Sequence, residues 1–154
     1  MKILFVCTHN RCRSILAEAV TNHYGDGLIS ACSAGSSPAG QVHPLTLAAL
    51  QRHGIATSGL SSKSWDDVED AGADVVVTVC DSAAQETCPV WFGDAHRVHW
   101  GLRDPSAINR SDAEVVQAFD ETIELLADRI RNLVRWVKAH PNDAGWKALM
   151  EGRQ

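Results

Sequence analysis

A cysteine and an arginine stand six residues apart in a loop near the start of the chain. The apolar segment Lys2–Val6 leads into Cys7, and the loop closes on Arg13 and Ser14. Apolar residues recur at helical spacing over 15–20, so the loop joins a buried strand to a helix. Such a turn directs several backbone N–H groups and the positive end of a helix dipole toward one point. The pattern therefore predicts a pocket for a tetrahedral anion.

The same loop supplies a candidate nucleophile. We expect the pKa of Cys7 to fall from about 8.5 into the range of roughly 4 to 7 under the helix dipole and the Arg13 guanidinium, which gives a thiolate at neutral pH. Arg13 can donate two N–H groups to the bound anion, and Ser14 can donate its hydroxyl to the thiolate. The candidate oxyanion-binding residues are Thr8, His9, Asn10, Arg11, Cys12 and Arg13. The alternative is a buried cysteine that happens to precede a surface arginine.

Composition favours one domain in a reducing compartment. The 154 residues are 45% hydrophobic, enough for a single core. The net charge of −5 and the scattered basic residues argue against nucleic-acid binding, and no apolar run approaches the roughly 20 residues of a membrane span. Five cysteines without a secretion signal favour thiol chemistry. We expect a cytoplasmic monomer that uses no cofactor and no metal.

Strands and helices alternate along the chain. Strands are predicted at 2–7, 28–34, 74–80 and 96–100, the third from its successive β-branched residues. Helices are predicted from Arg13 to about Tyr24, from Pro44 to before Gly54, and briefly from Ser64 to Asp70. A long helix should run from Ser111, a reciprocal cap with Glu114, to Pro141. Its apolar face comprises Val116, Phe119, Ile123, Leu126, Ile130, Leu133 and Val137. A further short helix is predicted around 146–150.

This alternation is typical of an α/β domain with a parallel sheet and helices on both faces. Ligands of such sheets bind beyond the carboxyl ends of the strands, where the strand order reverses. Cys7 ends the first predicted strand and Cys80 ends the third. The candidate anion site and a second thiol therefore share one edge of the sheet.

Two motifs carry a family resemblance. The spacing Cys-x5-Arg-Ser directly after a strand resembles the signature of low-molecular-weight protein tyrosine phosphatases and of the arsenate reductases that share their fold. The segment from Val-Val-Thr-Val-Cys80 through Cys88-Pro to His99-Trp100-Gly101 is similar to thioredoxin-coupled arsenate reductases. The resemblance covers residues 1–139 and leaves 140–154 as a C-terminal extension. It implies one flavodoxin-like three-layer domain with a four-stranded parallel sheet in the order 2-1-3-4, in which Cys7 and Cys80 lie on one rim.

Two reactions fit the anion loop. Hydrolysis of a phosphate monoester needs one thiol and an acid, whereas arsenate leaves as arsenite only if a second thiol attacks the cysteine–arsenic adduct. We hypothesise that Cys7 attacks arsenate, that Cys80 attacks Cys7, and that Cys88 attacks Cys80. Thioredoxin would then reduce the Cys80–Cys88 disulfide, although glutathione with glutaredoxin could instead resolve Cys7. Phosphate and sulfate should act as substrate analogues.

The resemblance also implies the acid. In both branches of the family an aspartate before a proline lies over the anion loop, and Asp104-Pro105 matches it here. The phosphatases usually carry aromatic residues next, where this chain has Ser106-Ala107, and its only tyrosine is Tyr24. An open cleft without aromatic walls favours a small inorganic oxyanion over a phosphotyrosine peptide.

The chain departs from the family pattern at two places. His9 stands where the family loop often has glycine. Some reductases of the family bind potassium through residues matching Asn10, Glu18 and Ser33, together with an aspartate near the position of Lys63. We expect the Lys63 ammonium to occupy that place and pair with Glu18, with little potassium dependence as the result.

Other interpretations remain. A low-molecular-weight phosphatase that acts through a phosphocysteine is the main alternative to the reductase. A non-catalytic oxyanion sensor would need neither Asp104 nor a second thiol. Cys80, Cys88, His96 and His99 are suitable zinc ligands by type, but their spacing is not that of zinc sites. Cys12 and Cys32 are expected to be packing residues.

Overall fold

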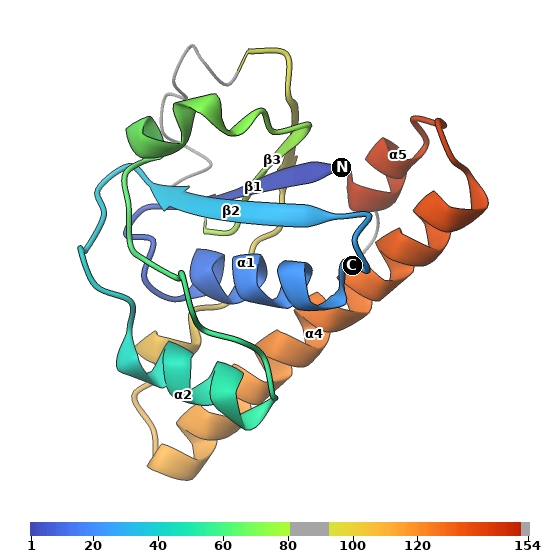
Figure 1. The fold of residues 1–154 in the computed structure, drawn as a ribbon. Helices are drawn as coiled ribbons and strands as arrows, with labels where there is room; N and C mark the ends of the chain where they lie inside the picture. Colours follow the sequence, from blue (N-terminus) through green and yellow to red (C-terminus); the bar gives the residue numbers. More distant parts are fainter. Residues whose placement is uncertain (81–92, 152–154) are drawn as a thin grey trace.

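Four parallel strands form the centre of the molecule. The structure, a computed structural model, describes residues 1–80 and 93–151. The sheet order is β2-β1-β3-β4, as predicted, and the strands lie side by side in Figure 1. Their bounds are β1 (Lys2–Cys7), β2 (Ser30–Gly35), β3 (Val75–Thr78) and β4 (His96–His99).

The register brings the functional end of β1 between its two neighbours. Cys7 pairs with Gly35 of β2, and Val6 pairs with Thr78 of β3. The predicted second strand began two residues too early. The backbone N–H groups of Leu28 and Ile29 both donate to the Gly25 carbonyl, in the turn after the first helix, so strand pairing starts at Ser30.

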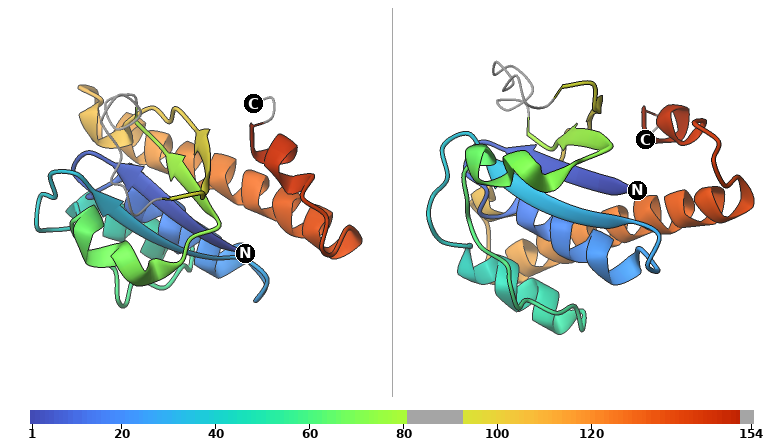
Figure 2. Two further views of the ribbon diagram at one scale, coloured as in Figure 1. Left: turned by 90° about the horizontal axis from the view of Figure 1, so that it is seen from above. Right: turned by 45° about the horizontal axis from the view of Figure 1, so that its top comes forward.

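Helices cover both faces of the sheet. On one face lie α1 (Arg13–Tyr24) and α4 (Asp112–Ala139), with α2 (Pro44–Arg52) packed outside them. The other face carries η1 (Trp65–Ala71) next to β2. Figure 2 shows that α4 crosses the sheet obliquely. The segment predicted as a short helix after Ser64 is thus a 3-10 helix, and Ser64 and Asp67 cap each other reciprocally at its start.

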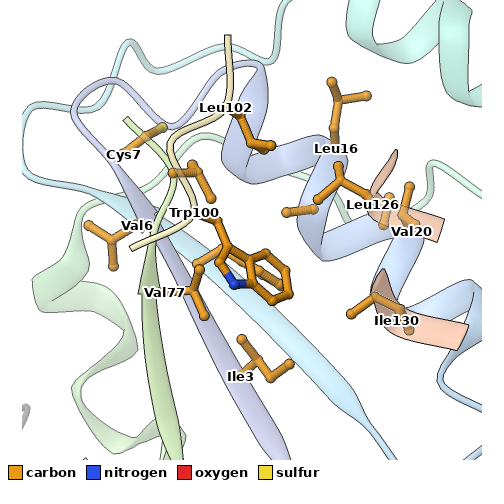
Figure 3. Close-up of a cluster of buried hydrophobic side chains, with 14 of the residues drawn as sticks. Ile3, Val6, Cys7, Leu16, Val20, Val77, Trp100, Leu102, Leu126 and Ile130 are labelled. Atoms are coloured by element: carbon orange, nitrogen blue, oxygen red, sulfur yellow. The ribbon is translucent and has the colours of Figure 1, made fainter. Parts of the chain in front are cut away.

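The core lies between the sheet and the two long helices. Phe119, Ile123, Leu126, Ile130 and Leu133 of α4 are buried, but Val116, expected on the same face, is 38% exposed. Figure 3 shows the indole of Trp100 lying among strand residues such as Ile3 and Val77, with Leu126 and Ile130 nearby.

Ser111 caps the start of α4. The Ser111 hydroxyl accepts from the Glu114 backbone N–H, as predicted. The predicted reciprocal bond is wrong, because the Glu114 carboxylate accepts from the Ser111 hydroxyl at 3.1 Å and not from the Ser111 backbone N–H.

Beyond Ala139, α5 (Trp146–Glu151) returns to β4, where Met150 O accepts from the Trp100 indole at 2.8 Å. No helix within 1–80 or 93–151 is long and apolar enough to cross a membrane.

Candidate active site

The loop between β1 and α1 turns its carbonyl groups outward. Thr8 O accepts from Ser37 N at 2.9 Å, His9 O accepts from Ala39 N at 3.0 Å, and Arg11 O accepts from His43 N at 2.9 Å. In a trans peptide the N–H points away from the C=O of the same unit. The N–H groups of residues 9, 10 and 12 therefore face the inside of the loop, as an anion-binding site requires.

Gly35 allows this close approach between β2 and the loop. A methyl group at Gly35 would lie 2.5 Å from Thr8 O and 3.0 Å from both Asn10 N and Cys7 O. All three are backbone atoms, which cannot move without reshaping the loop. Any side chain at this position would therefore displace the backbone that surrounds Cys7.

Asn10 connects the loop to its surroundings. Its backbone has a φ of 47°, in the left-handed region, which asparagine tolerates better than most residues. The fully buried side chain donates from Nδ2 to Ser14 Oγ at 2.8 Å and to Ser33 Oγ at 2.9 Å, and Oδ1 accepts from Lys63 N at 2.9 Å. One side chain therefore joins the loop to α1, β2 and the segment before η1.

These contacts fix the direction of the hydrogen bond between Ser14 and Cys7. The two side chains are 2.8 Å apart, Oγ to Sγ. Because Asn10 Nδ2 already donates to Ser14 Oγ, the hydroxyl proton is available to the sulfur. The backbone N–H of Asn10 donates to the same sulfur at 3.1 Å. Cys7 thus receives hydrogen bonds from both Ser14 and Asn10 that favour a thiolate.

Burial nevertheless raises the pKa of the Cys7 thiol, and the hydrogen bonds from Ser14 and Asn10 lower it by less. The prediction of a strongly lowered pKa is therefore wrong for this arrangement. Arg13, which was expected to lower it, is already engaged. Its Nη1 donates to Leu102 O at 3.1 Å and its Nη2 lies 3.7 Å from Asp104 Oδ2, so a carboxylate offsets much of its positive charge.

Asp104 faces the anion loop from the segment after β4. Its Oδ1 accepts from the backbone N–H of Ser106 at 2.9 Å and from the Ser106 hydroxyl at 2.6 Å, while Oδ2 points toward Arg13. A small cavity of about 30 Å³ separates the two sides. It is lined by Cys7, Thr8, His9, Arg11, Cys12, Arg13 and Asp104. The nucleophile, the guanidinium and the candidate acid thus converge on one cavity.

Cys80 lies beside the loop. Its sulfur is 3.7 Å from Thr8 Oγ1, and it is close enough to Cys7 for its charge to oppose ionisation of that thiol. The pairing of β1 with β3 explains this placement, because Val79 N donates to Val6 O at 3.0 Å. Cys80 is buried and unbonded to another cysteine. Cys88 lies outside the described residues.

Lys63 pairs with Glu18, as expected from the departure at that position. Lys63 Nζ is 3.6 Å from Glu18 Oε1, and the same oxygen accepts from Ser33 Oγ at 2.7 Å. Lys63 Nζ also donates to Ser61 O at 3.1 Å. The ammonium therefore lies next to Glu18, one of the residues at which the family resemblance implies a potassium site in some reductases.

The remaining cysteines and histidines do not converge. Cys12 is buried near Thr46 and Ser106, and burial raises the pKa of Cys12 to about 11. His96 pairs with Glu151 at 2.7 Å, whereas His99 contacts the Thr78 hydroxyl at 2.8 Å. Within the described part of the chain, no three His, Cys, Asp or Glu side chains are grouped as a metal site would require.

The sequence did not indicate several supporting residues. Gly35, His43 and Thr46 all contact the anion loop from positions more than 20 residues away. The glycine that ends a predicted strand was the one signal available for Gly35. His43 and Thr46 had none, because they act through the Arg11 carbonyl, which no side-chain pattern indicates.

Comparison with known proteins identifies the family to which the chain belongs. The family model described as low molecular weight phosphotyrosine protein phosphatase matches residues 2–142. An arsenate reductase of Halalkalibacterium halodurans is 35% identical over 129 residues, 84% of this chain and 91% of that protein. A glutaredoxin arsenate reductase of Synechocystis sp. is 29% identical over 133 residues, 86% of this chain and 95% of that protein.

Solved structures agree with the sequence comparisons. An arsenate reductase in the phosphate binding state matches with a TM-score of 0.71 and 29% identity, over 88% of this chain and 98% of that one. A thioredoxin-dependent arsenate reductase of Corynebacterium glutamicum matches with a TM-score of 0.66 and 30% identity, over 90% of this chain and 62% of that one. The chain therefore belongs to the low-molecular-weight phosphotyrosine protein phosphatase family, in which it is similar to proteins named arsenate reductase.

Proposed function

We propose that this chain reduces arsenate to arsenite through a relay of thiols. The observation that carries the proposal is the position of Cys80, whose sulfur lies 3.7 Å from Thr8 in the loop that holds Cys7. A hydrolase of this family needs one thiol, and a second thiol at the same edge has a use in reduction. The names of the relatives support the same reaction.

The first step is attack of Cys7 on arsenic. The inward N–H groups of the loop and Arg13 hold the oxyanion, with residues 8–13 as its binding site. A bond forms between Cys7 Sγ and arsenic, and the bond from arsenic to one hydroxyl oxygen breaks. Asp104, across the cavity, takes up the proton that the thiol releases and delivers it to that oxygen, which leaves as water. Ser14 and the Asn10 N–H stabilise the sulfur anion as it forms.

The second step is the reduction. The Cys80 thiolate attacks Cys7 Sγ, a Cys7–Cys80 disulfide forms, and the sulfur–arsenic bond breaks with its electron pair remaining on arsenic. Arsenic(V) thereby becomes arsenic(III) and leaves as arsenite, while the two sulfurs are oxidised. The neighbouring ends of β1 and β3 support this step, since Cys7 is the last residue of β1 and Cys80 follows β3 by two residues.

The third step returns Cys7 to its thiol. Cys88 attacks Cys80, and the resulting Cys80–Cys88 disulfide is reduced by the dithiol of thioredoxin. A thioredoxin-dependent enzyme and a glutaredoxin arsenate reductase both occur among the similar proteins. Thioredoxin fits the three-cysteine sequence of this chain better, because glutathione attack on the arsenic adduct requires no Cys88. Dependence on free thiols also favours a reducing compartment such as the cytoplasm.

Hydrolysis of phosphate monoesters is the second candidate. The family's name and the arrangement of Cys7, Arg13 and Asp104 both support it, because an in-line attack on phosphorus uses the same groups. Water would then open the phosphocysteine without any second thiol. The two functions therefore differ in their need for Cys80.

Replacement of Cys80 by serine tests the proposal. The Cys80→Ser variant should lose arsenite production with thioredoxin while keeping any hydrolysis of an aryl phosphate. Cys32→Ser is the matched control, because Cys32 is a half-buried cysteine on β2 that has no part in the relay. Equal loss of both activities in Cys80→Ser, or full arsenite production, would contradict the relay.

Alkylation and mass spectrometry after one turnover identify the route. A Cys80–Cys88 disulfide in the wild-type protein is expected with arsenate alone. A mixed disulfide of glutathione, found only when glutathione is added, would replace the thioredoxin route with the glutaredoxin one. Absence of any disulfide after arsenite release would refute both.

A further inference from the structure

The cavity over Cys7 contains a second arginine with a charge that no other described group uses. Arg11 and Arg13 both line it, together with His9 and one carboxylate, Asp104. The side chain of Arg13 donates to Leu102 O and lies next to Asp104. Arg11 is exposed, and among residues 1–80 and 93–151 its guanidinium has no hydrogen bond and no ion pair.

The backbone of Arg11 is nevertheless held firmly. Its carbonyl accepts from His43 N at 2.9 Å and from the Thr46 hydroxyl at 3.4 Å, both at the start of α2. The guanidinium therefore extends from a fixed base at the mouth of the cavity. The Arg11 charge also acts on the start of α2. Burial is the larger cause that lowers the pKa of His43, and the Arg11 charge is the second.

His9 adds a second basic group at the same mouth. Its Nδ1 lies 3.2 Å from the carbonyl of Ser37, and a carbonyl only accepts, so Nδ1 carries the proton. The ring is thereby oriented. Its Nε2 makes no hydrogen bond within the described residues and is left for a ligand.

We propose that the Arg11 side chain is a recognition residue for the oxyanion, and that with His9 it forms an outer part of the site selective for doubly charged tetrahedral anions. The proposal rests on the proposed function for its substrate, arsenate. The loop N–H groups and Arg13 bind the oxygens that point inward, whereas Arg11 contacts the oxygen that faces the mouth. It also attracts the dianion from solvent, because an unpaired positive charge at a cavity mouth raises the local concentration of anions.

Substitution of Arg11 tests this through anion binding alone. The probe is inorganic phosphate, measured by how well it protects Cys7 from alkylation. Arg11→Gln should need about 5- to 10-fold more phosphate for half protection, with a similar rise in the KM for arsenate. Lys147→Gln removes the same charge from an exposed position on α5, and it should leave both values unchanged. Thermal unfolding of each variant checks that the loop is intact.

Salt provides the second readout. Between about 10 and 150 mM salt the Debye length falls from about 30 to about 8 Å, so wild-type affinity should drop and the Arg11→Gln variant should respond less. Arg11→Lys, which keeps the charge, should keep the salt response. Protection equal to that of Lys147→Gln, or an unchanged salt response, would overturn the inference. If the wild type makes no arsenite but the protection result holds, the proposed function fails while the outer site stands.

Discussion

Replacing Lys63 with an uncharged residue should make the stability of the protein depend on a monovalent cation, because the Lys63 ammonium no longer pairs with Glu18. Lys63 Nζ lies 3.6 Å from Glu18 Oε1, and the exposed fractions of the two side chains are 23% and 11%. At an effective dielectric constant of about 20 this separation gives an attraction of about 5 kcal/mol. Partial solvation and about 2 kcal/mol of side-chain entropy offset much of it, which leaves a net contribution of about 2 kcal/mol.

The Lys63→Met variant should therefore lose about 2 kcal/mol of unfolding free energy, because the Glu18 carboxylate retains the Ser33 hydroxyl but no cation. Potassium should restore part of the lost stability by binding next to the Glu18 carboxylate and the Ser33 hydroxyl. Urea unfolding in potassium, sodium and choline chloride at equal ionic strength measures both effects. The wild type should show the same stability and the same activity in all three salts.

A double-mutant cycle with Glu18→Gln isolates the pair. The coupling between the two substitutions should account for most of the loss in Lys63→Met, and Lys2→Met is a control for removing a lysine from the far end of β1. Severalfold activation of the wild type by potassium would refute the reasoning. So would a Lys63→Met variant that is as stable as the wild type in choline chloride.

Three further predictions concern the loop and its neighbours. Gly35→Ala should lower the rate of arsenite production about 100-fold, because the added methyl displaces Thr8 O. Gly40→Ala, whose added methyl has no atom within 4 Å, should keep that rate despite the backbone φ of 85° at Gly40. Burial raises the pKa of Cys12 to about 11, so the folded protein favours its neutral thiol. Stability is then constant below about pH 8.5 and falls by about 1 to 2 kcal/mol by pH 10, and urea unfolding at both pH values should show a smaller fall in Cys12→Ala. Asp104→Asn should lower kcat by about 100-fold with little change in phosphate protection of Cys7, and an unchanged kcat would exclude it as the acid.

The fold could be predicted because its signals are local and repeated. The β-branched run of β3 and the regular spacing of Phe119 to Leu133 each depend on near neighbours in sequence. Val116 follows the same spacing but lies in the first turns of α4 and is exposed. Periodicity indicates which face of a helix is apolar, but it cannot show how far along the helix that face is covered.

The positions of the chemical groups were predictable, and their electrostatics were not. The loop motif for Cys7 and Arg13, and the family resemblance for Asp104, predicted residues that line one cavity. The direction in which the Cys7 pKa shifts depends on burial and on the partners of Arg13. One of these partners, the Leu102 carbonyl, lies 89 residues from Arg13 along the chain. The Lys63–Glu18 pair was predictable only because the family resemblance supplied the missing geometry.

The outward carbonyls of the anion loop make its shape a property of the whole domain. A short peptide copy of residues 7–14 would possess every group that the loop uses, yet nothing would bind its Thr8, His9 and Arg11 carbonyls on the outside. Such a peptide would have no reason to turn its amides toward one point. Grafting the motif onto another strand–helix junction should transfer the nucleophile without the anion site, unless the connection from β2 to α2 is moved with it.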